Sequence, residues 1–524
     1  MNRSYATFSV KGGTEPLIGY TDGMFQLLLL ACKTPIVEVT PPQPVILSLS
    51  VEAVPEDANI VVNGIADDGD QVWSQLSPGE YDIAISRTGF ATANSTINID
   101  ATDAENGIVT VRLELEPENM PLHFSFTPAD TAWVLTTSNG ETQTGSEAFS
   151  GEVPSGLTTV TATKEGMNPL EWSHFIDAPV SHNWWLDPAG QVLHRINQFQ
   201  SGPHPKGLTI SSGENPRIWV SLLAGPPSVE SYDLLTAEQT STLSIGVNGA
   251  VEVLLSDNEE RVFASQMETA AAYEIDAETG ALLRTFPSKS AWSKMMVLSP
   301  DGSLLYLSNW SGNDISEINL ETGETQRKLR STTTPRGMFI TPDGQYLYIA
   351  GFGNGILERI GIQSGARETL FDNGGALRHI VADYDNGRMY ISDMRKGVIW
   401  LHDIEAKTTT VLARTDANPN TIDLSPDGQL LFVSCRGVNN RESYYKPGPQ
   451  WGSVLVFDAM TGEQLDAIVA GNQPTALDVS PDGRYLAYSD YLDNTINVFA
   501  IPDTQTLREA GGGRSSTYKA ELRK

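Results

Sequence analysis

The sequence predicts an all-β protein in which two small β-sandwich domains precede a seven-bladed β-propeller. Three observations favour this architecture. Short runs in the first third of the chain alternate apolar and polar residues, which is the period of a half-buried strand. Two modules there duplicate each other, with Gly79 and Gly156 in equivalent turns 77 residues apart. From Gly302 onward a turn motif recurs at spacings of 41 to 55 residues.

The first 45 residues predict a targeting segment and a linker. An apolar run ends in Leu29-Leu30-Ala31-Cys32, which resembles a bacterial lipobox, and the proline-rich stretch after it predicts a stiff linker. The resemblance implies that Cys32 is lipidated and anchors an exported protein to a membrane. Residues 1–23 are polar and lack the basic region of a signal peptide. A misassigned start codon would account for this mismatch. The alternative to a lipoprotein is an apolar stub that packs on or near the first domain.

Residues 46–117 and 118–188 predict the two sandwich domains. In the first, Tyr81-Asp82-Ile83-Ala84-Ile85-Ser86 alternates polar and apolar residues between turns rich in Asn, Gly and Pro. In the second, Val160-Thr161-Ala162-Thr163 repeats the alternation. This pattern is typical of half-buried antiparallel strands joined by tight turns.

The first of these domains carries a recognisable series of turns. The order Val62-Asn63-Gly64, Ser77-Pro78-Gly79-Glu80-Tyr81 and Gly89-Phe90 resembles the PEGA family of small extracytoplasmic β domains. The second domain has a weaker version, with Thr137-Ser138-Asn139-Gly140 and Leu157-Thr158-Thr159 in the corresponding places. The resemblance implies accessory modules at the cell envelope that hold no catalytic residues.

Residues 189–505 carry a longer repeat that predicts four short strands per unit. A Ser/Thr-Pro-Asp-Gly turn, replaced once by Asp-Asn-Gly, precedes an apolar strand in each clear copy. The turn recurs at Gly302, Gly344, Gly387, Gly428 and Gly483. Two diverged copies come earlier, near Gly213 and Asn258, and a second turn closes most units. Seven units of four strands predict a seven-bladed β-propeller.

These units resemble the bacterial YVTN-type propellers, relatives of the NHL and WD40 groups, over roughly residues 200–503. The resemblance implies a fold and leaves the activity open. The last unit lacks a fourth strand, so we expect Gln191–Phe199, which precedes the first unit, to pair with it and remove the exposed edge. Residues 506–524 are polar and include three consecutive glycines. We expect this tail to be disordered.

Composition and motif content exclude several classes of function. Lys and Arg number 34 against 65 Asp and Glu, and the net charge of −31 does not favour a nucleic-acid partner. The sequence contains no run of 18 apolar residues, which is the length that would predict a transmembrane helix. Cys32 and Cys435 are the two cysteines and have dissimilar surroundings, so we expect neither a disulfide framework nor a zinc site. Enzyme motifs and metal-ligand spacings are missing, so we predict no catalytic residue, metal or cofactor.

One set of residues predicts a binding site at a rim of the central channel. Alignment of the innermost strands places four cations and three uncharged residues in register. They are Lys206, Val251, Lys294, Arg336, Arg378, Asn420 and Thr475. Cations ~10 Å apart repel by about 1.7 kcal/mol per pair at an effective dielectric constant of about 20, so they need counter-anions. Local carboxylates or solvent anions are one source, and an anionic ligand is the other.

The sixth unit adds a loop that we expect over this rim. Its extra residues run from Arg436 to Trp451 and include Tyr444 and Tyr445. An aromatic and basic insertion over a cationic rim is typical of a lid or recognition loop, although it could instead pack on a neighbouring blade. His379 is either a proton donor at the rim or a packed side chain.

Together these features predict a non-enzymatic protein of the cell envelope, either periplasmic or anchored to the outer membrane through Cys32. Its cationic rim would bind an anionic small molecule, a glycan or a protein partner. A structural scaffold is one alternative. A lactonase-like hydrolase or lyase at the central channel is another, implied by related propellers. That chemistry needs several carboxylates and amides around a metal, whereas the rim offers only Asn420 as a neutral ligand.

Overall fold

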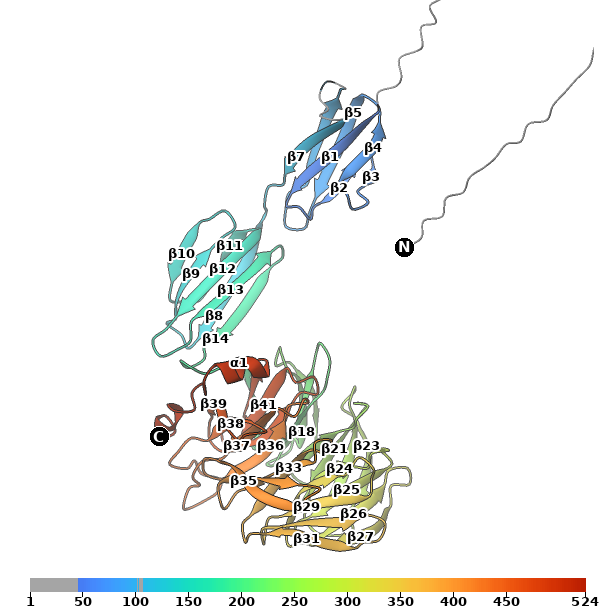
Figure 1. Ribbon diagram of the computed structural model, residues 1–524, viewed down its shortest axis with the longest axis vertical. Coiled ribbons are helices and arrows are strands. Elements are labelled where there is room, and N and C mark those ends of the chain that lie inside the picture. The colour runs from blue at the N-terminus through green and yellow to red at the C-terminus, as the bar shows by residue number, and fades with distance from the viewer. Residues whose placement is uncertain (1–45, 101, 103–106) are drawn as a thin grey trace, which may run out of the picture. The chain divides into compact units, whose positions relative to one another are not determined.

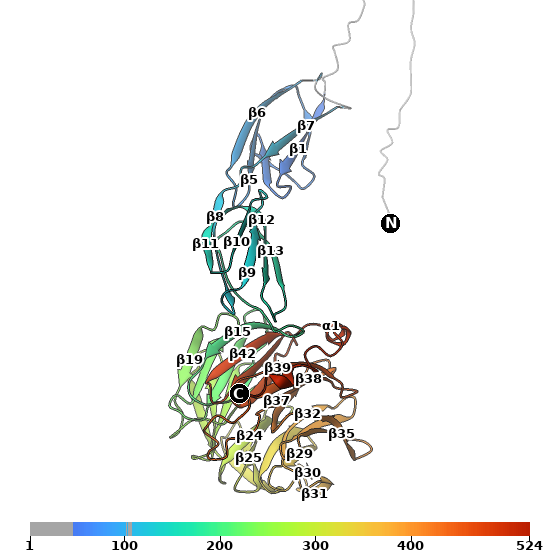
Figure 2. The ribbon, with the colours of Figure 1, turned by 90° about the vertical axis from the view of Figure 1, so that its left-hand side faces the viewer.

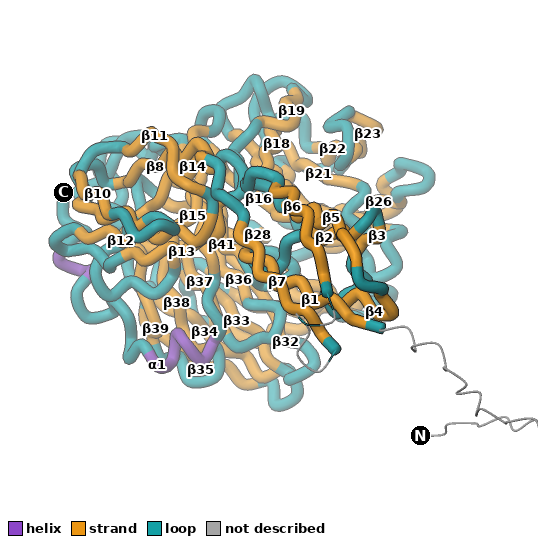
Figure 3. Tube along the Cα trace, turned by 90° about the horizontal axis from the view of Figure 1, so that it is seen from above, coloured by secondary structure: helices purple, strands orange, loops and turns teal. Residues whose placement is uncertain are grey.

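The computed structural model describes residues 46–100, 102 and 107–524, which form an all-β protein (Figure 1). These residues form 42 strands and two short helices, so the predicted fold class is confirmed at the level of an all-β chain. Figure 3 shows strands throughout the trace. Within this part of the chain, no helix has the length and apolar character needed to span a bilayer. Cys32 and the proline-rich linker lie outside the described residues.

The first domain has two sheets. In one, β1 (Leu47–Val54) lies between β4 (Val72–Leu76), which is antiparallel to it, and β7 (Ile108–Glu114), which is parallel. The other has the order β3 (Ile65–Ala66), β2 (Asn59–Val62), β5 (Gly79–Ser86), β6 (Ala93–Ile99). Alternate residues of β1 are buried, including Leu49 and Val51. The period-two alternation in the sequence therefore separates core side chains from exposed ones.

The second domain repeats this strand order. One sheet consists of β11 (Phe149–Pro154), β8 (Asn119–Thr127) and β14 (Val180–Trp185). The other has the order β10 (Thr142–Gly145), β9 (Ala132–Thr136), β12 (Gly156–Thr163), β13 (Leu170–Ile176). Phe124 is fully buried, and its ring centroid lies 5.1 Å from those of Trp133 and Phe149. An aromatic cluster thus forms the centre of this core.

Seven four-stranded antiparallel sheets follow (Figures 1 and 2), and the contacts between their first strands close a ring. The first strands are β16 (Pro205–Ile210), β20 (Glu252–Leu255), β24 (Ser293–Leu298), β28 (Pro335–Ile340), β32 (Leu377–Asp383), β36 (Pro419–Leu424) and β40 (Pro474–Val479). Each contacts the first strand of the next sheet, and β40 contacts β16. This arrangement is β-propeller-like.

The second and third strands carry most of the apolar core between the sheets. The second strands are β17 (Arg217–Leu222), β21 (Arg261–Gln266), β25 (Leu304–Asn309), β29 (Tyr346–Gly351), β33 (Arg388–Asp393), β37 (Leu430–Cys435) and β41 (Tyr485–Asp490). The third strands are β18 (Val229–Asp233), β22 (Ala271–Asp276), β26 (Asp314–Asn319), β30 (Ile356–Gly361), β34 (Val398–Asp403), β38 (Ser453–Asp458) and β42 (Thr495–Ala500). β37 and β38 are buried along their whole length, as expected for strands covered on both faces.

The fourth strands lie at the outer edge, and one of them comes from the opposite end of the repeat region. They are β19 (Gln239–Leu243), β23 (Leu282–Pro287), β27 (Thr325–Arg330), β31 (Arg367–Asp372), β35 (Thr408–Arg414), β39 (Gln464–Val469) and β15 (His194–Gln200). β15 precedes the first sheet and pairs antiparallel with β42 of the last, from His194 opposite Ala500 to Gln200 opposite Thr495. The predicted closure of the last sheet by the segment before the first unit is confirmed.

The prediction of disorder for residues 506–524 is wrong. Asp503 caps the helix α1 (Thr504–Glu509) by accepting a hydrogen bond of 2.9 Å from the Thr506 amide, and a short 3-10 helix covers Tyr518–Ala520. Leu507 and Tyr518 are fully buried. The Tyr518 hydroxyl donates to Asp416 Oδ2 at 2.8 Å. A few apolar anchors therefore order a segment whose average composition is polar.

Candidate functional site

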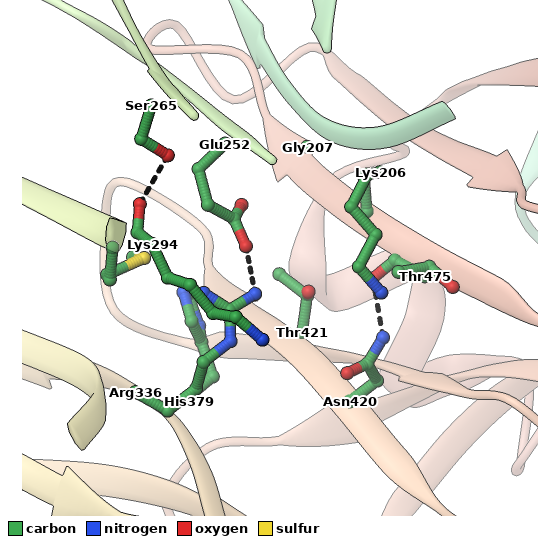
Figure 4. A network of polar contacts seen from close by, with 12 residues as sticks. Lys206, Gly207, Glu252, Ser265, Lys294, Arg336, His379, Asn420, Thr421 and Thr475 are labelled. Atoms are coloured by element: carbon green, nitrogen blue, oxygen red, sulfur yellow. Dashed lines mark hydrogen bonds and ion pairs between the residues drawn. The ribbon is translucent and has the colours of Figure 1, made fainter. Parts of the chain in front are cut away.

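The cations aligned from the sequence lie together at one end of the first strands. Lys206, Lys294, Arg336 and Arg378 are each the second residue of β16, β24, β28 and β32, so the repeat places them at the same depth. Figure 4 shows the charged ends of Lys294 and Arg336 close together below Glu252, and the amine of Lys206 beside Asn420 and Thr475. We call these four residues together with Arg436 and Glu252 the cationic cluster.

Glu252 is the carboxylate of this cluster and was missed from the sequence. It pairs with the Arg336 guanidinium, whose side chain is 2 % exposed (Figure 4). Burial acts to raise the pKa of Glu252, but Arg336 and Arg378 outweigh it and hold the pKa below its usual value. A Cβ on Gly207 would lie 2.8 Å from Glu252 Oε2, so this glycine leaves room for the carboxylate.

Three arginines of the cluster have polar groups without a partner. Arg336 Nη1 and Arg436 Nε are buried and make no hydrogen bond. Arg378 is 6 % exposed, and among the described residues its guanidinium has neither a hydrogen bond nor an ion pair. Asn420 donates to the Thr475 carbonyl oxygen at 3.1 Å, but its Oδ1 has no donor. Buried guanidinium groups normally have carboxylate partners, so the arginines here exceed what the protein itself neutralises.

Both lysines of the cluster lie against aromatic rings. Lys206 Nζ donates to the Tyr444 hydroxyl at 3.1 Å and lies 5.1 Å from the centre of the Tyr491 ring. Lys294 Nζ lies 3.5 Å from the centre of the Trp310 ring. Burial and the neighbouring Arg436 hold the pKa of Lys206 well below its usual value. Burial and Arg336 lower the pKa of Lys294 to about 6.

Part of the inserted loop lies on the cationic cluster. The Arg436 guanidinium lies 4.1 Å from the centre of the Tyr444 ring and pairs with Gln473, whose amide donates to the Tyr444 carbonyl oxygen at 2.9 Å. Tyr445 is 60 % exposed, and its ring centre lies 5.6 Å from that of His204. The structure therefore places Arg436, Tyr444 and Tyr445 at or near the cluster.

Trp451 and His379 do not have the positions or properties expected of site residues. The Trp451 amide donates to Leu522 at 2.8 Å and its ring lies 4.3 Å from Lys524 Nζ, so the side chain packs against the C-terminal segment. Burial and Arg378 lower the pKa of His379 to about 4, and its Nδ1 lies 2.9 Å from the Ile422 carbonyl oxygen. Because the imidazole is neutral and hydrogen bonded to the backbone, His379 is better described as a packed side chain than as a proton donor.

The cluster offers little to a metal ion. Among the described residues, the one group of three or more potential metal ligands is Asp67, Asp68 and Asp70, in the first domain. At the cationic cluster Glu252 is the carboxylate, and it is already paired with Arg336. The arrangement can bind oxyanions, because guanidinium groups present N–H donors in a planar fork that matches carboxylate and phosphate oxygens.

Comparison with known proteins places the chain in a family. No family model matches it. Antigen Lp49 of Leptospira interrogans is 37 % identical over 330 residues, which cover 60 % of this chain and 71 % of the antigen. Autophagy-related protein 18 of Aspergillus terreus is 30 % identical over 123 residues, which are 21 % of this chain and 30 % of that protein. A solved chain of Kuenenia stuttgartiensis hydrazine synthase gives a TM-score of 0.49 at 17 % identity, covering 58 % of this chain and 97 % of that one. On the first of these matches, the chain belongs to the family of antigen Lp49.

Proposed function

We propose that this protein is a non-enzymatic binding protein of the cell envelope that holds an anionic ligand at the cationic cluster. The observation that carries the proposal is the charge imbalance there. Arg336, Arg378 and Arg436 are almost fully buried, and Glu252 is the carboxylate among them. Buried ionised groups need a partner of opposite charge, and an anion from outside the protein would supply it.

The proposal takes the seven four-stranded sheets as the blades of a seven-bladed, YVTN-type propeller. The closed ring of first strands and the pairing of β15 with β42 support this reading. In such a propeller the first strands surround a central channel, and the loops at its rim carry binding. The inserted loop, through Tyr444, lies at this rim and gives the ligand one aromatic wall.

The location at the envelope rests on the family and on the N-terminal half of the chain. The relative is named an antigen, which fits a protein exposed at a surface. The two N-terminal domains, taken as PEGA-like, would space the propeller from a lipid anchor at Cys32. Mass spectrometry of the membrane fraction would detect a diacylated Cys32 peptide, and an unmodified peptide from the soluble fraction would overturn the anchor.

Thermal melting in the presence of anions tests the binding proposal. We expect sulfate, phosphate, citrate or acidic glycans to raise the melting temperature by mass action, and Arg378→Ala to abolish that rise. Arg378 is the suitable arginine because its guanidinium has no ion pair to break. Lys407→Ala, which removes an exposed ion pair with Glu368, is the matched control and should keep the response. If no anion shifts the melting temperature of the wild type, the proposal is wrong.

A further inference from the structure

We infer that the ligand of the cationic cluster is a small dianionic oxyanion, and that binding it adds protons to Lys206 and Lys294. This inference rests on the proposed function and gives it a ligand class. It follows from three properties of the cluster, which are the count of permanent charges, the burial of the free donors and the surroundings of the two amines.

The permanent charges favour a ligand with two negative charges. Guanidinium groups stay protonated at all ordinary pH values, so Arg336, Arg378 and Arg436 contribute three positive charges. Glu252 contributes one negative charge, because the arginines around it keep it ionised. The remaining excess is two positive charges. A monoanion would leave half of this excess without a partner in a site where water is largely excluded.

The free donors come from three different sheets. Arg336 Nη1 and Arg436 Nε are buried without acceptors, and within the described part of the chain the Arg378 guanidinium contacts no acceptor. Arg336 and Arg378 extend from neighbouring first strands, whereas Arg436 follows directly after β37. Buried guanidinium donors on several strands suit a group with several oxygens, such as a phosphate, a sulfate or a pair of carboxylates.

The two lysines have surroundings that disfavour a proton. Besides Glu252, the charged groups that act on Lys206 are Arg436, Arg378 and Arg336, and its other neighbours are Tyr444, Tyr491 and His204. Arg336, Lys206, Arg378 and Glu252 act on Lys294, and Trp310 covers its amine. Burial is the largest cause of the lowered pKa of both amines, and the positive neighbours, which outnumber Glu252, lower it further.

A bound dianion would reverse the electrostatic part of this balance, because each amine would gain a partner of opposite charge although it stays buried. Two negative charges near the amines offset the repulsion from the arginines, so the ammonium forms become favoured and the lysines take up protons from solvent. Each protonated lysine then adds an ion pair to the ligand, but it also adds one positive charge to the cluster, so the repulsion between the two ammonium groups opposes full protonation of both. Affinity should therefore rise as the pH falls from above neutrality toward the pKa of the free lysines, while the net proton uptake is at most one per lysine.

Isothermal titration calorimetry of the full chain tests this inference. Sulfate is the main ligand, because it keeps two negative charges over the whole pH range used. Inorganic phosphate, a sugar phosphate and succinate separate the possible sources of the dianion, and acetate is the monoanion. Titrations in buffers with different ionisation enthalpies give the number of protons bound from the slope of the observed enthalpy.

We expect sulfate to bind at least about tenfold more tightly than acetate, with uptake of up to two protons and an affinity that increases from pH about 8.5 to about 6.5. Lys294→Met should lower the proton uptake, and Lys407→Ala should leave it unchanged. Equal affinities for sulfate and acetate, or sulfate binding without proton uptake, would overturn this inference and leave the proposed function standing. Binding of none of the anions would overturn both.

Discussion

Replacement of Glu252 by Gln should destabilise the protein strongly, because it removes the internal counter-charge of the cationic cluster. The side chain keeps its shape, so the effect is mainly electrostatic. Arg336 is 2 % exposed and Glu252 is 17 % exposed, which places the pair away from bulk water. Removal of one partner of a buried ion pair costs about 3–5 kcal/mol, since the other charge is left uncompensated. Unit charges ~4 Å apart at an effective dielectric constant of about 20 give a similar value, about 4 kcal/mol.

Differential scanning calorimetry at neutral pH and low salt measures this effect. In a large domain each kcal/mol shifts the melting temperature by roughly 2–4 °C, so Glu252→Gln should lower it by roughly 6 °C or more. Glu368→Gln is the matched control, because Glu368 also contacts two cations, Arg359 and Lys407, but its side chain is 41 % exposed. Exposed ion pairs are worth at most about 1 kcal/mol, so the control should shift by only a few degrees.

The difference in stability between the wild type and Glu252→Gln should depend on pH in one direction. The pKa of Glu252 is lower in the folded protein than in the unfolded chain, so its stabilising contribution is present above the unfolded value. That contribution is lost as the pH falls through the folded pKa. The wild type and Glu252→Gln should therefore converge in acid, and sulfate should restore more stability to the variant than to the wild type. A variant that melts within about 1 °C of the wild type, without a response to sulfate, would refute the charge imbalance on which the site is built.

Other buried groups give separate predictions. Lys294→Met should stabilise the protein, because the folded state lowers the pKa of this amine to about 6 while the unfolded chain keeps it protonated. In melts at a series of pH values, the difference in free energy of unfolding between the variant and the wild type should grow by up to about 1.4 kcal/mol per pH unit as the pH falls from 9 to 6. A difference that does not depend on pH would contradict this reasoning. Burial raises the pKa of Asp423 to about 6 and that of the adjacent Asp478 well above its usual value. The protein therefore loses stability as the pH rises through the pKa values of these two carboxyl groups in the folded state. Asp478→Asn should have a higher melting temperature than the wild type at pH about 8 but not at pH about 5. Tyr518→Phe should lower the free energy of unfolding by about 1–2 kcal/mol through loss of the hydrogen bond to Asp416, whereas an unchanged calorimetric transition would mean that the C-terminal segment adds no stability.

The fold was largely predictable because its determinants are local. A turn of the type Ser-Pro-Asp-Gly fixes where a strand begins, and in the structure Ser299 and Asp301 hydrogen bond within this turn at 2.6 Å. The missing fourth strand of the last unit could be inferred from counting alone. The order of residues 506–524 could not, because it depends on the docking of Leu507 and Tyr518 onto a distant sheet. The overall composition of a segment does not show that one or two of its side chains are buried against another part of the protein.

The site was predictable in part, for a related reason. Repetition fixes the depth of the second residue in each first strand, so alignment alone brought Lys206, Lys294, Arg336 and Arg378 to one level. The second unit is diverged, and alignment placed the buried Val251 at that level. Glu252, one residue further on, was overlooked. It is the only acidic residue at its position among the seven units, and that singularity in the sequence could have identified it.

Buried charged residues elsewhere in the same sheets are paired one to one, which shows why the cationic cluster is unusual. Glu274, Glu317 and Glu358 are almost fully buried on third strands, and each pairs with an arginine of the adjacent fourth strand. Each buried carboxylate there has its own cation, which is the arrangement that electrostatics favours. The cationic cluster departs from it with three buried arginines around one carboxylate. Well-packed apolar residues would be more stable at these positions, so the excess charge is a cost that the proposed anion would offset. Binding of the proposed anion to the folded protein would relieve this repulsion, so the stability of the protein should rise with the concentration of the anion.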